Sequence, residues 1–333
     1  MRKAFRPRLI PYNMGIIKKP SELEVKSTLT ALIYGSPGVG KSTIACSAPA
    51  AVMLDFDNGV NRVNGAHRIP TAQVRNWEEV VEVLEEIKAE PSYRTIIIDT
   101  VGKMMAYMED FIKRTNPKMK QYDGSLSLKG FGMRKQMFIN FIKEVGMTGK
   151  NIIFVAHELE QKRGDETILR PEIGGSSGND LIKELDLVGY MEMYGNKRTI
   201  SFSPCEKYYA KNTCGLPGVI EIPVTVDEHD NPIGENTFMQ TVIKAYRDRL
   251  VRSKEQTAEY EALNDTIAEK IGDITSAADA NAFVIWMADV KHVYNSRAVA
   301  AAKFQTKVKE LGLSFDKETK TYNDPATESN GAA

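Results

Sequence analysis

The nine-residue stretch 35–43, GSPGVGKST, constrains the fold of this chain most. Its three spaced glycines are followed by a lysine and two hydroxyl residues. It fits the pattern G-x-x-x-x-G-K-[ST] and follows a β-type run, TLTALIY, at a point where a helical run begins. In such a loop the backbone amides surround a triphosphate, the lysine reaches the β- and γ-phosphates, and the first hydroxyl binds Mg²⁺. The sequence therefore predicts a site for ATP and Mg²⁺ made by Gly35, Ser36, Pro37, Gly38, Val39, Gly40, Lys41, Ser42 and Thr43.

Short apolar runs alternate with amphipathic helices on both sides of this loop. We expect strands at 28–34, 51–56, 95–98, 151–156, 185–191 and 199–203, and helices from residue 41, over 77–88 and over 133–145. This alternation predicts an α/β fold with a mostly parallel, doubly wound sheet. Only three of the 24 glycines and one of the 14 prolines lie after residue 250, which predicts a small all-α region there.

We therefore expect four parts: a basic N-terminal arm (1–27), an ATPase core (28–250), a helical region of two to four helices (251–321) and a disordered tail (322–333). The formal net charge is zero, which argues against a wholly basic nucleic-acid binder. Residues 1–26 nevertheless hold seven basic and two acidic residues, and this arm suits either DNA phosphates or a neighbouring subunit. Three scattered cysteines suit the cytoplasm (the host cytoplasm if the chain is phage-encoded), and we expect no membrane association.

A phosphate-binding loop needs a carboxylate to hold its metal. Asp99 ends the run Thr95–Ile98 of four β-branched residues, as a Walker-B aspartate would, so we expect Asp99 and Ser42 to bind Mg²⁺. Thr100 rather than Glu follows it, so the residue that orients the attacking water lies elsewhere. Asp57 is our first choice and Asp55 the second, since both share one face at the end of a strand. His157, at the tip of another strand, is a candidate sensor of the γ-phosphate.

The order of these motifs resembles the RecA-type recombinase core over residues 28–225, and most of all the RecA-like ATPases found with phage single-strand-annealing proteins. RecA-type proteins have Glu where Asp57 falls and Gln where His157 falls. The resemblance implies an ATPase that binds single-stranded DNA through two loops, here 113–135 and 159–180. The first has seven basic residues against Asp123 alone, with interleaved aromatic rings. The candidate DNA-binding residues are Lys118, Lys120, Tyr122, Lys129, Phe131, Arg134, Lys162, Arg163, Gly174 and Gly175.

The resemblance also implies a homo-oligomer, either a filament or a ring, in which Lys211 of one subunit reaches the ATP of its neighbour. Residues 251–333 hold 10 basic and 13 acidic residues, which does not favour DNA, so we expect the helical region to bind a protein such as a single-strand-binding or replication protein. Two other functions stay open. One is an AAA+-type helicase loader or remodelling ATPase, and the other is an ATP-dependent DNA-binding or annealing module with negligible turnover.

Overall fold

The computed structural model describes residues 16–164, 166–175 and 177–325. It divides into two compact units. The first is Lys26–Arg249, and the second joins the residues from Leu250 onward with those before Lys26. Most of the predicted basic arm and most of the predicted tail lie outside the described residues. Within the described ranges, no helix combines the length and the apolar character needed to cross a membrane.

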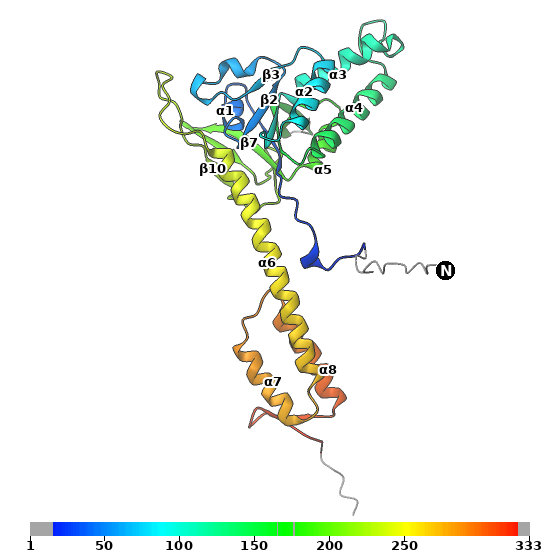
Figure 1. The fold of residues 1–333 in the computed structure, drawn as a ribbon, viewed down its shortest axis with the longest axis vertical. Helices are drawn as coiled ribbons and strands as arrows, with labels where there is room; N and C mark the ends of the chain where they lie inside the picture. The colour runs from blue at the N-terminus through cyan, green and yellow to red at the C-terminus, as the bar shows by residue number, and fades with distance from the viewer. Residues whose placement is uncertain (1–15, 165, 176, 326–333) are drawn as a thin grey trace, which may run out of the picture. The chain divides into compact units, whose positions relative to one another are not determined.

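A mostly parallel sheet organises the first unit and confirms the predicted α/β class (Figure 1). The strand order is β10-β8-β7-β1-β5-β4-β2-β3, with β6 paired to β5 and β9 paired to β7. The strand that enters the P-loop, β1, lies parallel to both β5 and β7, while β4 pairs with β5 on its far side. The strands are β1 (Thr30–Gly35), β2 (Ala51–Asp55), β3 (Thr71–Gln73), β4 (Thr95–Asp99), β5 (Asn151–Arg163), β6 (Glu166–Pro171), β7 (Leu187–Tyr194), β8 (Lys197–Ser201), β9 (Lys211–Asn212) and β10 (Val219–Glu221).

Helices cover both faces of this sheet, which explains why its central strands are apolar on both sides. Figure 1 shows α2, α3 and α4 together on one side of the strands and α1 on the other. On the first side, Leu32, Ile96 and Phe154 of the sheet join a buried cluster with Leu84 of α2 and Phe138 of α4. The helices of this unit are α1 (Lys41–Ala45), α2 (Trp77–Ala89), α3 (Val101–Thr115), α4 (Leu128–Gly146) and α5 (Ser177–Glu184).

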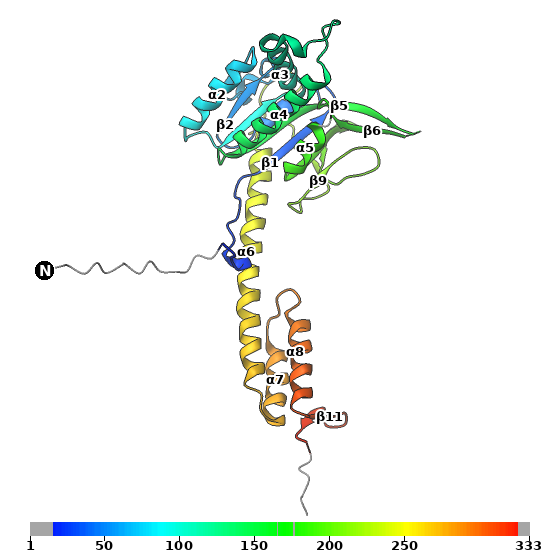
Figure 2. The same ribbon diagram turned by 90° about the vertical axis from the view of Figure 1, so that its right-hand side faces the viewer.

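The segment predicted as a second loop, 159–180, folds differently. Strand β5 continues to Arg163 and pairs antiparallel with β6, so that Glu158 opposes Pro171 and Arg163 opposes Glu166. The resulting hairpin extends away from the rest of the sheet (Figure 2). Gly164, with φ +65°, lies just after the end of the first strand, and the Gly-Asp dipeptide at this point of the sequence is a known hairpin signal. The prediction of a loop was therefore wrong for residues 159–171 and for α5.

The second unit contains a small helical core, in agreement with the predicted all-α region. Helix α6 (Phe238–Gly272) begins earlier than expected and contributes Ile267 to this core. It packs with α7 (Ala277–Asp289) and α8 (Ser296–Glu310) through Phe283 and Phe304, whose rings stack at 5.0 Å. A hairpin of β11 (Ser314–Asp316) and β12 (Thr321–Asn323) follows, so the end of the region predicted to be all-α holds a short strand pair. The Tyr322 ring packs on Phe304, so the folded chain continues past residue 322, where the tail was expected to begin.

Candidate active site

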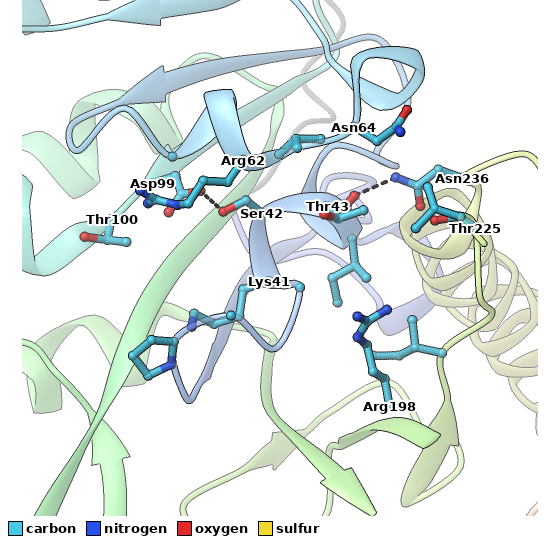
Figure 3. A pocket seen from close by; sticks show the side chains of 18 of the residues that line it. Lys41, Ser42, Thr43, Arg62, Asn64, Asp99, Thr100, Arg198, Thr225 and Asn236 are labelled. Atoms are coloured by element: carbon cyan, nitrogen blue, oxygen red, sulfur yellow. Dashed lines mark hydrogen bonds between the residues drawn. The ribbon is translucent and has the colours of Figure 1, made fainter. Parts of the chain in front are cut away.

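A cavity of about 730 Å³ opens at the carboxyl edge of the parallel strands (Figure 3). Its volume lies within the range typical of small-molecule sites, roughly 300 to 1,000 Å³. Much of the P-loop lines the cavity, and so do the four residues predicted to act in catalysis, Lys41, Asp57, Asp99 and His157. Asp57 follows the end of β2 and Asp99 ends β4, whereas His157 lies within β5, because that strand continues to Arg163 instead of ending where the sequence predicted its tip. These three strands are neighbours in the sheet. The structure thus brings together residues that lie more than 100 positions apart in the sequence.

Lys41 begins α1 and is only 5% exposed. Its ammonium donates to the carbonyl oxygens of Gly35 at 2.9 Å and Ser36 at 2.7 Å. Burial lowers the pKa of Lys41, and the nearby carboxylates of Asp99, Glu158 and Asp57 oppose this shift. A buried ammonium near neutral carbonyls is well placed to gain from an anion.

The predicted metal ligands are in direct contact. The Ser42 hydroxyl donates to Asp99 Oδ2 at 2.5 Å, and Asp99 is 2% exposed. Burial raises the pKa of Asp99 to about 6, which the Ser42 hydroxyl opposes and the neighbouring carboxylates of Asp57 and Asp55 increase. A hydroxyl and a carboxylate are the oxygen donors that Mg²⁺ prefers, and Mg²⁺ is usually held by one or two carboxylates together with substrate phosphates. Among the described residues no group of three or more His, Cys, Asp or Glu could hold a metal alone.

Asp55 and Asp57 have different environments. Both carboxylate oxygens of Asp55 accept from backbone amides: Gly59 at 2.9 Å and Asp57 at 3.3 Å share Oδ1, and Val60 donates to Oδ2 at 3.0 Å. Asp57 lines the cavity instead, with Oδ2 3.5 Å from a guanidinium nitrogen of Arg62. Its buried Oδ1 has no hydrogen-bond partner within the described structure. Asp55 therefore holds the turn, while Asp57 retains an acceptor for a water or ligand.

His157 lies opposite Gly35 in the register of β5 and β1. Its buried Nδ1 also has no partner in the described part of the chain. Burial lowers the pKa of His157, as does the Lys41 ammonium, so the ring is neutral at pH 7. The next residue, Glu158, was not singled out in the sequence. It accepts from the P-loop hydroxyl of Ser36 at 2.6 Å and from the hydroxyl of Tyr190 at 3.0 Å.

Two arginines and one segment complete the cavity without any motif in the sequence. Arg62 lies near the Asp57 end, in the 3-10 helix η2 (Gly59–Arg62). Arg198 on β8 lies near Gly40, because its Cδ and Nε would be 3.7 Å from a Cβ added to that glycine. The segment 222–236 forms the remaining wall and follows β10. Sequence reasoning missed these residues because they are remote from the P-loop along the chain and carry no fixed spacing to it.

The first predicted DNA-binding segment, 113–135, is partly helical and much of its positive charge is paired. Arg134 lies on α4, is 13% exposed in its side chain and forms an ion pair with Glu109 at 2.8 Å. Its guanidinium also lies over the Phe131 ring, 4.9 Å from the centroid. Three further basic residues of the segment pair with acidic residues: Lys113, Arg114 and Lys135. The predicted contacts that remain exposed are Lys118, Lys120, Tyr122, Lys129 and Phe131.

The second predicted segment keeps some of its proposed DNA contacts at the surface. Lys162 is exposed near the end of the hairpin. The side chain of Arg163 lies outside the described residues. Gly174 lies against Arg134, whose guanidinium nitrogen would be 3.1 Å from an added Cβ. Gly175 has φ +67° in the turn before α5.

Lys211, the predicted contact to a neighbouring subunit, lies on β9. Its ammonium donates to the carbonyl oxygens of Ile182 at 3.1 Å and Lys183 at 3.4 Å, at the end of α5. These contacts favour a lysine because helix C-terminal carbonyls attract positive charge. A contact with the ATP of a second subunit stays a prediction.

Comparison with known proteins finds one matching family and one similar protein. Residues 27–214 match a family model described as an AAA domain. The SPbeta prophage-derived uncharacterized protein YorG of Bacillus subtilis (strain 168) is 27% identical over 158 residues, which cover 43% of this chain and 47% of that protein. The chain thus spans about half the length of this curated relative. The matched family region includes the P-loop, Asp57, Asp99 and His157 and ends before the wall at 222–236.

Proposed function

Because the chain belongs to the AAA domain family, we propose that it is a Mg²⁺-dependent ATPase of RecA type that binds single-stranded DNA and supports phage recombination or annealing. The observation that carries the ATPase is the juxtaposition of a P-loop lysine, a Ser42–Asp99 pair and an unpartnered acceptor on Asp57 in one cavity. The prophage origin in the name of its Bacillus subtilis relative supports a phage setting.

Each residue then has a defined chemical task. When ATP binds, the Lys41 ammonium gives up its hydrogen bonds to the carbonyl oxygens of Gly35 and Ser36 and donates to the β- and γ-phosphates instead. There it offsets the negative charge of the phosphoryl group in the transition state. Ser42 and Asp99 would hold Mg²⁺, which would offset the negative charge of the phosphate oxygens. Asp57 accepts a hydrogen bond from the attacking water through Oδ1 and orients it in line with the γ-phosphate. His157, neutral at pH 7, senses whether that phosphate is present.

Binding of single-stranded DNA rests on exposed residues that lie between α3 and α4 and in the first turn of α4. Tyr122 is fully exposed, Phe131 is 42% exposed, and Lys118, Lys120 and Lys129 surround them in the sequence. Aromatic faces stack on unpaired bases while lysines attract phosphates, in a manner tolerant of sequence. We extend the proposal to a homo-oligomer, with Lys211 at the subunit boundary, and to a single-strand-binding or replication protein as the partner of the helical unit.

Phosphate release with and without single-stranded DNA, measured across salt concentrations, tests this function. We expect DNA to stimulate release, and we expect Lys41→Ala to abolish it while Lys88→Ala, an exchange on the outer side of α2, leaves it near the wild-type rate. Near-normal turnover of Lys41→Ala would contradict the ATPase assignment. Nucleotide binding without turnover, with or without DNA, would instead favour an ATP-dependent binding module.

A further inference from the structure

The cavity continues beyond the residues that a triphosphate and its metal need. Figure 3 shows Lys41, Ser42 and Asp99 on one side of the start of α1, and Arg198, Thr225 and Asn236 on the other. The second group includes residues from the segment 222–236, which lies outside the family match that ends at 214. A ligand that fills the whole cavity must therefore have a second part, next to the phosphates and of different chemistry.

We propose that Arg198 and the segment 222–236 form a nucleoside subsite, in which the base of the nucleoside triphosphate stacks on the Arg198 guanidinium. This inference rests on the proposed ATPase function and assigns residues to the other half of its substrate.

Arg198 supplies the planar group. The residues that line the described cavity include no Phe, Tyr or Trp, so no aromatic ring competes to stack on a base. The Arg198 side chain is exposed to the cavity, and no carboxylate of the described residues lies within ion-pair distance of it. A guanidinium is weakly hydrated and stacks on π faces. Its Nε lies beside Gly40 of the P-loop, so a base joined through its ribose to phosphates held by that loop would lie near Arg198.

The wall offers apolar surface and hydrogen-bond acceptors. Ile222, Pro223 and Val226 line the cavity together with Thr225 and Asp230, whose side chains carry a hydroxyl and a carboxylate. Acceptors of this kind suit the donors of a nucleoside, namely the ribose hydroxyls and the exocyclic amino group of a base. A triphosphate alone, which carries only negative charge and acceptor oxygens, would gain nothing from them.

Hydrogen bonds hold this wall against the P-loop side of the unit. The Asn236 amide donates to the carbonyl oxygen of Thr43 at 2.6 Å. Asn64 donates to the carbonyl oxygen of Asp230 at 2.7 Å, and a ring nitrogen of His67 lies 3.2 Å from that of Thr225. Arg198 contacts the same wall through its backbone, because its carbonyl oxygen accepts from the backbone amide of Ile222 at 2.9 Å. The subsite is therefore formed before the ligand arrives.

Equilibrium binding of ATP and of inorganic tripolyphosphate, each with Mg²⁺, tests the proposal on the full chain. We expect the wild type to bind ATP at least about tenfold more tightly than tripolyphosphate, from stacking of one base. Arg198→Ala should remove most of that difference by weakening ATP alone. Arg198→Lys keeps the charge without the planar group and should behave like Arg198→Ala. Arg75→Ala, which changes an exposed arginine paired with Glu79 outside the cavity, is the matched control.

Three outcomes overturn the inference. Equal affinity of the wild type for ATP and tripolyphosphate would show that no nucleoside subsite exists. An equal loss of both ligands in Arg198→Ala, with recovery in Arg198→Lys, would make Arg198 a phosphate contact instead. Failure of the wild type to bind either ligand would refute the ATPase function itself, and this result is distinguishable from the other two. Circular dichroism of each variant confirms that the fold is retained.

Discussion

Isosteric exchanges of Asp55 and Asp57 should separate a residue that holds the fold from a residue that acts in catalysis. Asp55→Asn replaces one carboxylate oxygen, which accepts from the backbone N–H of Gly59 or Val60, with an NH₂ group. Two donors then face each other and that hydrogen bond is lost. A hydrogen bond to a charged acceptor contributes about 1.5 to 3 kcal/mol, and a buried N–H without a partner adds a cost. Because Asp55 is 1% exposed, we expect a loss of about 2 to 4 kcal/mol in the free energy of unfolding.

Asp57→Asn should behave in the opposite way. Its ion pair with Arg62 spans 3.5 Å, and the Arg62 side chain is 70% exposed, so the free energy of unfolding should change by less than about 1 kcal/mol. The amide is a poor acceptor for a proton from water, so turnover should fall by about 10² to 10⁴-fold. ATP affinity should change little, since Asp57 acts on the water rather than on the nucleotide.

Urea unfolding and single-turnover phosphate release measure the two effects. The chain has two tryptophans, Trp77 beside the core of the first unit and Trp286 beside that of the second. A Trp286→Phe background therefore gives fluorescence that reports on the ATPase unit alone. Equal destabilisation of the unit by Asp57→Asn and Asp55→Asn would refute these two roles. So would retained turnover in Asp57→Asn together with lost turnover in Asp55→Asn under folded conditions.

Three further predictions concern the metal, the DNA and the P-loop glycines. Burial raises the pKa of Asp99 to about 6, and Mg²⁺ binds the ionised carboxylate. The gain in nucleotide affinity that Mg²⁺ provides should therefore fall as the pH drops below 6, by up to about tenfold per pH unit. Binding titrations of Asp99→Asn should lack this pH dependence. In single-strand binding assays, Lys120→Ala should lower the slope of log K against log salt by about one, whereas Tyr122→Ala should weaken binding by about tenfold and leave the slope unchanged. In urea unfolding, Gly35→Ala should lower the free energy of unfolding by more than about 3 kcal/mol, because the new Cβ would overlap the Met191 carbonyl oxygen. Gly38→Ala should lower it by only about 1 to 2 kcal/mol, because Gly38 has φ +78° but open space around it.

The sequence was most informative where local chemistry determines structure. The P-loop, the apolar run before Asp99 and the strand before His157 each carry their own signal, and all three meet in the cavity. The hairpin after His157 also had a local signal, the Gly-Asp pair, although the family resemblance suggested a loop. Counting basic residues in a segment did not predict its free positive charge. Arg134, for example, is paired with Glu109 of α3, which lies 25 positions earlier in the sequence.

The nucleoside end of the cavity had no such signal. Arg198 lies on β8, between β7 and the edge strand β10. The segment 222–236 contacts the P-loop through single hydrogen bonds such as that from Asn236 to Thr43. Its placement depends on antiparallel pairing of β8 with β10, which no spacing in the sequence encodes. The choice between Asp55 and Asp57 also needed the fold, since alternation puts both on one face and only the amides of the turn distinguish them.

The length of β5 has a consequence for how motion spreads through the unit. This one strand of 13 residues begins between β1 and β4 and ends in the hairpin with β6. A β-strand is stiff along its axis, and its ladder amides exchange with solvent only when the pairing opens. The amides of residues 159–163 should therefore open together with those at the root of the hairpin. A ligand that immobilises His157 and Glu158 should then slow deuterium uptake at the hairpin tip, far from its own contacts.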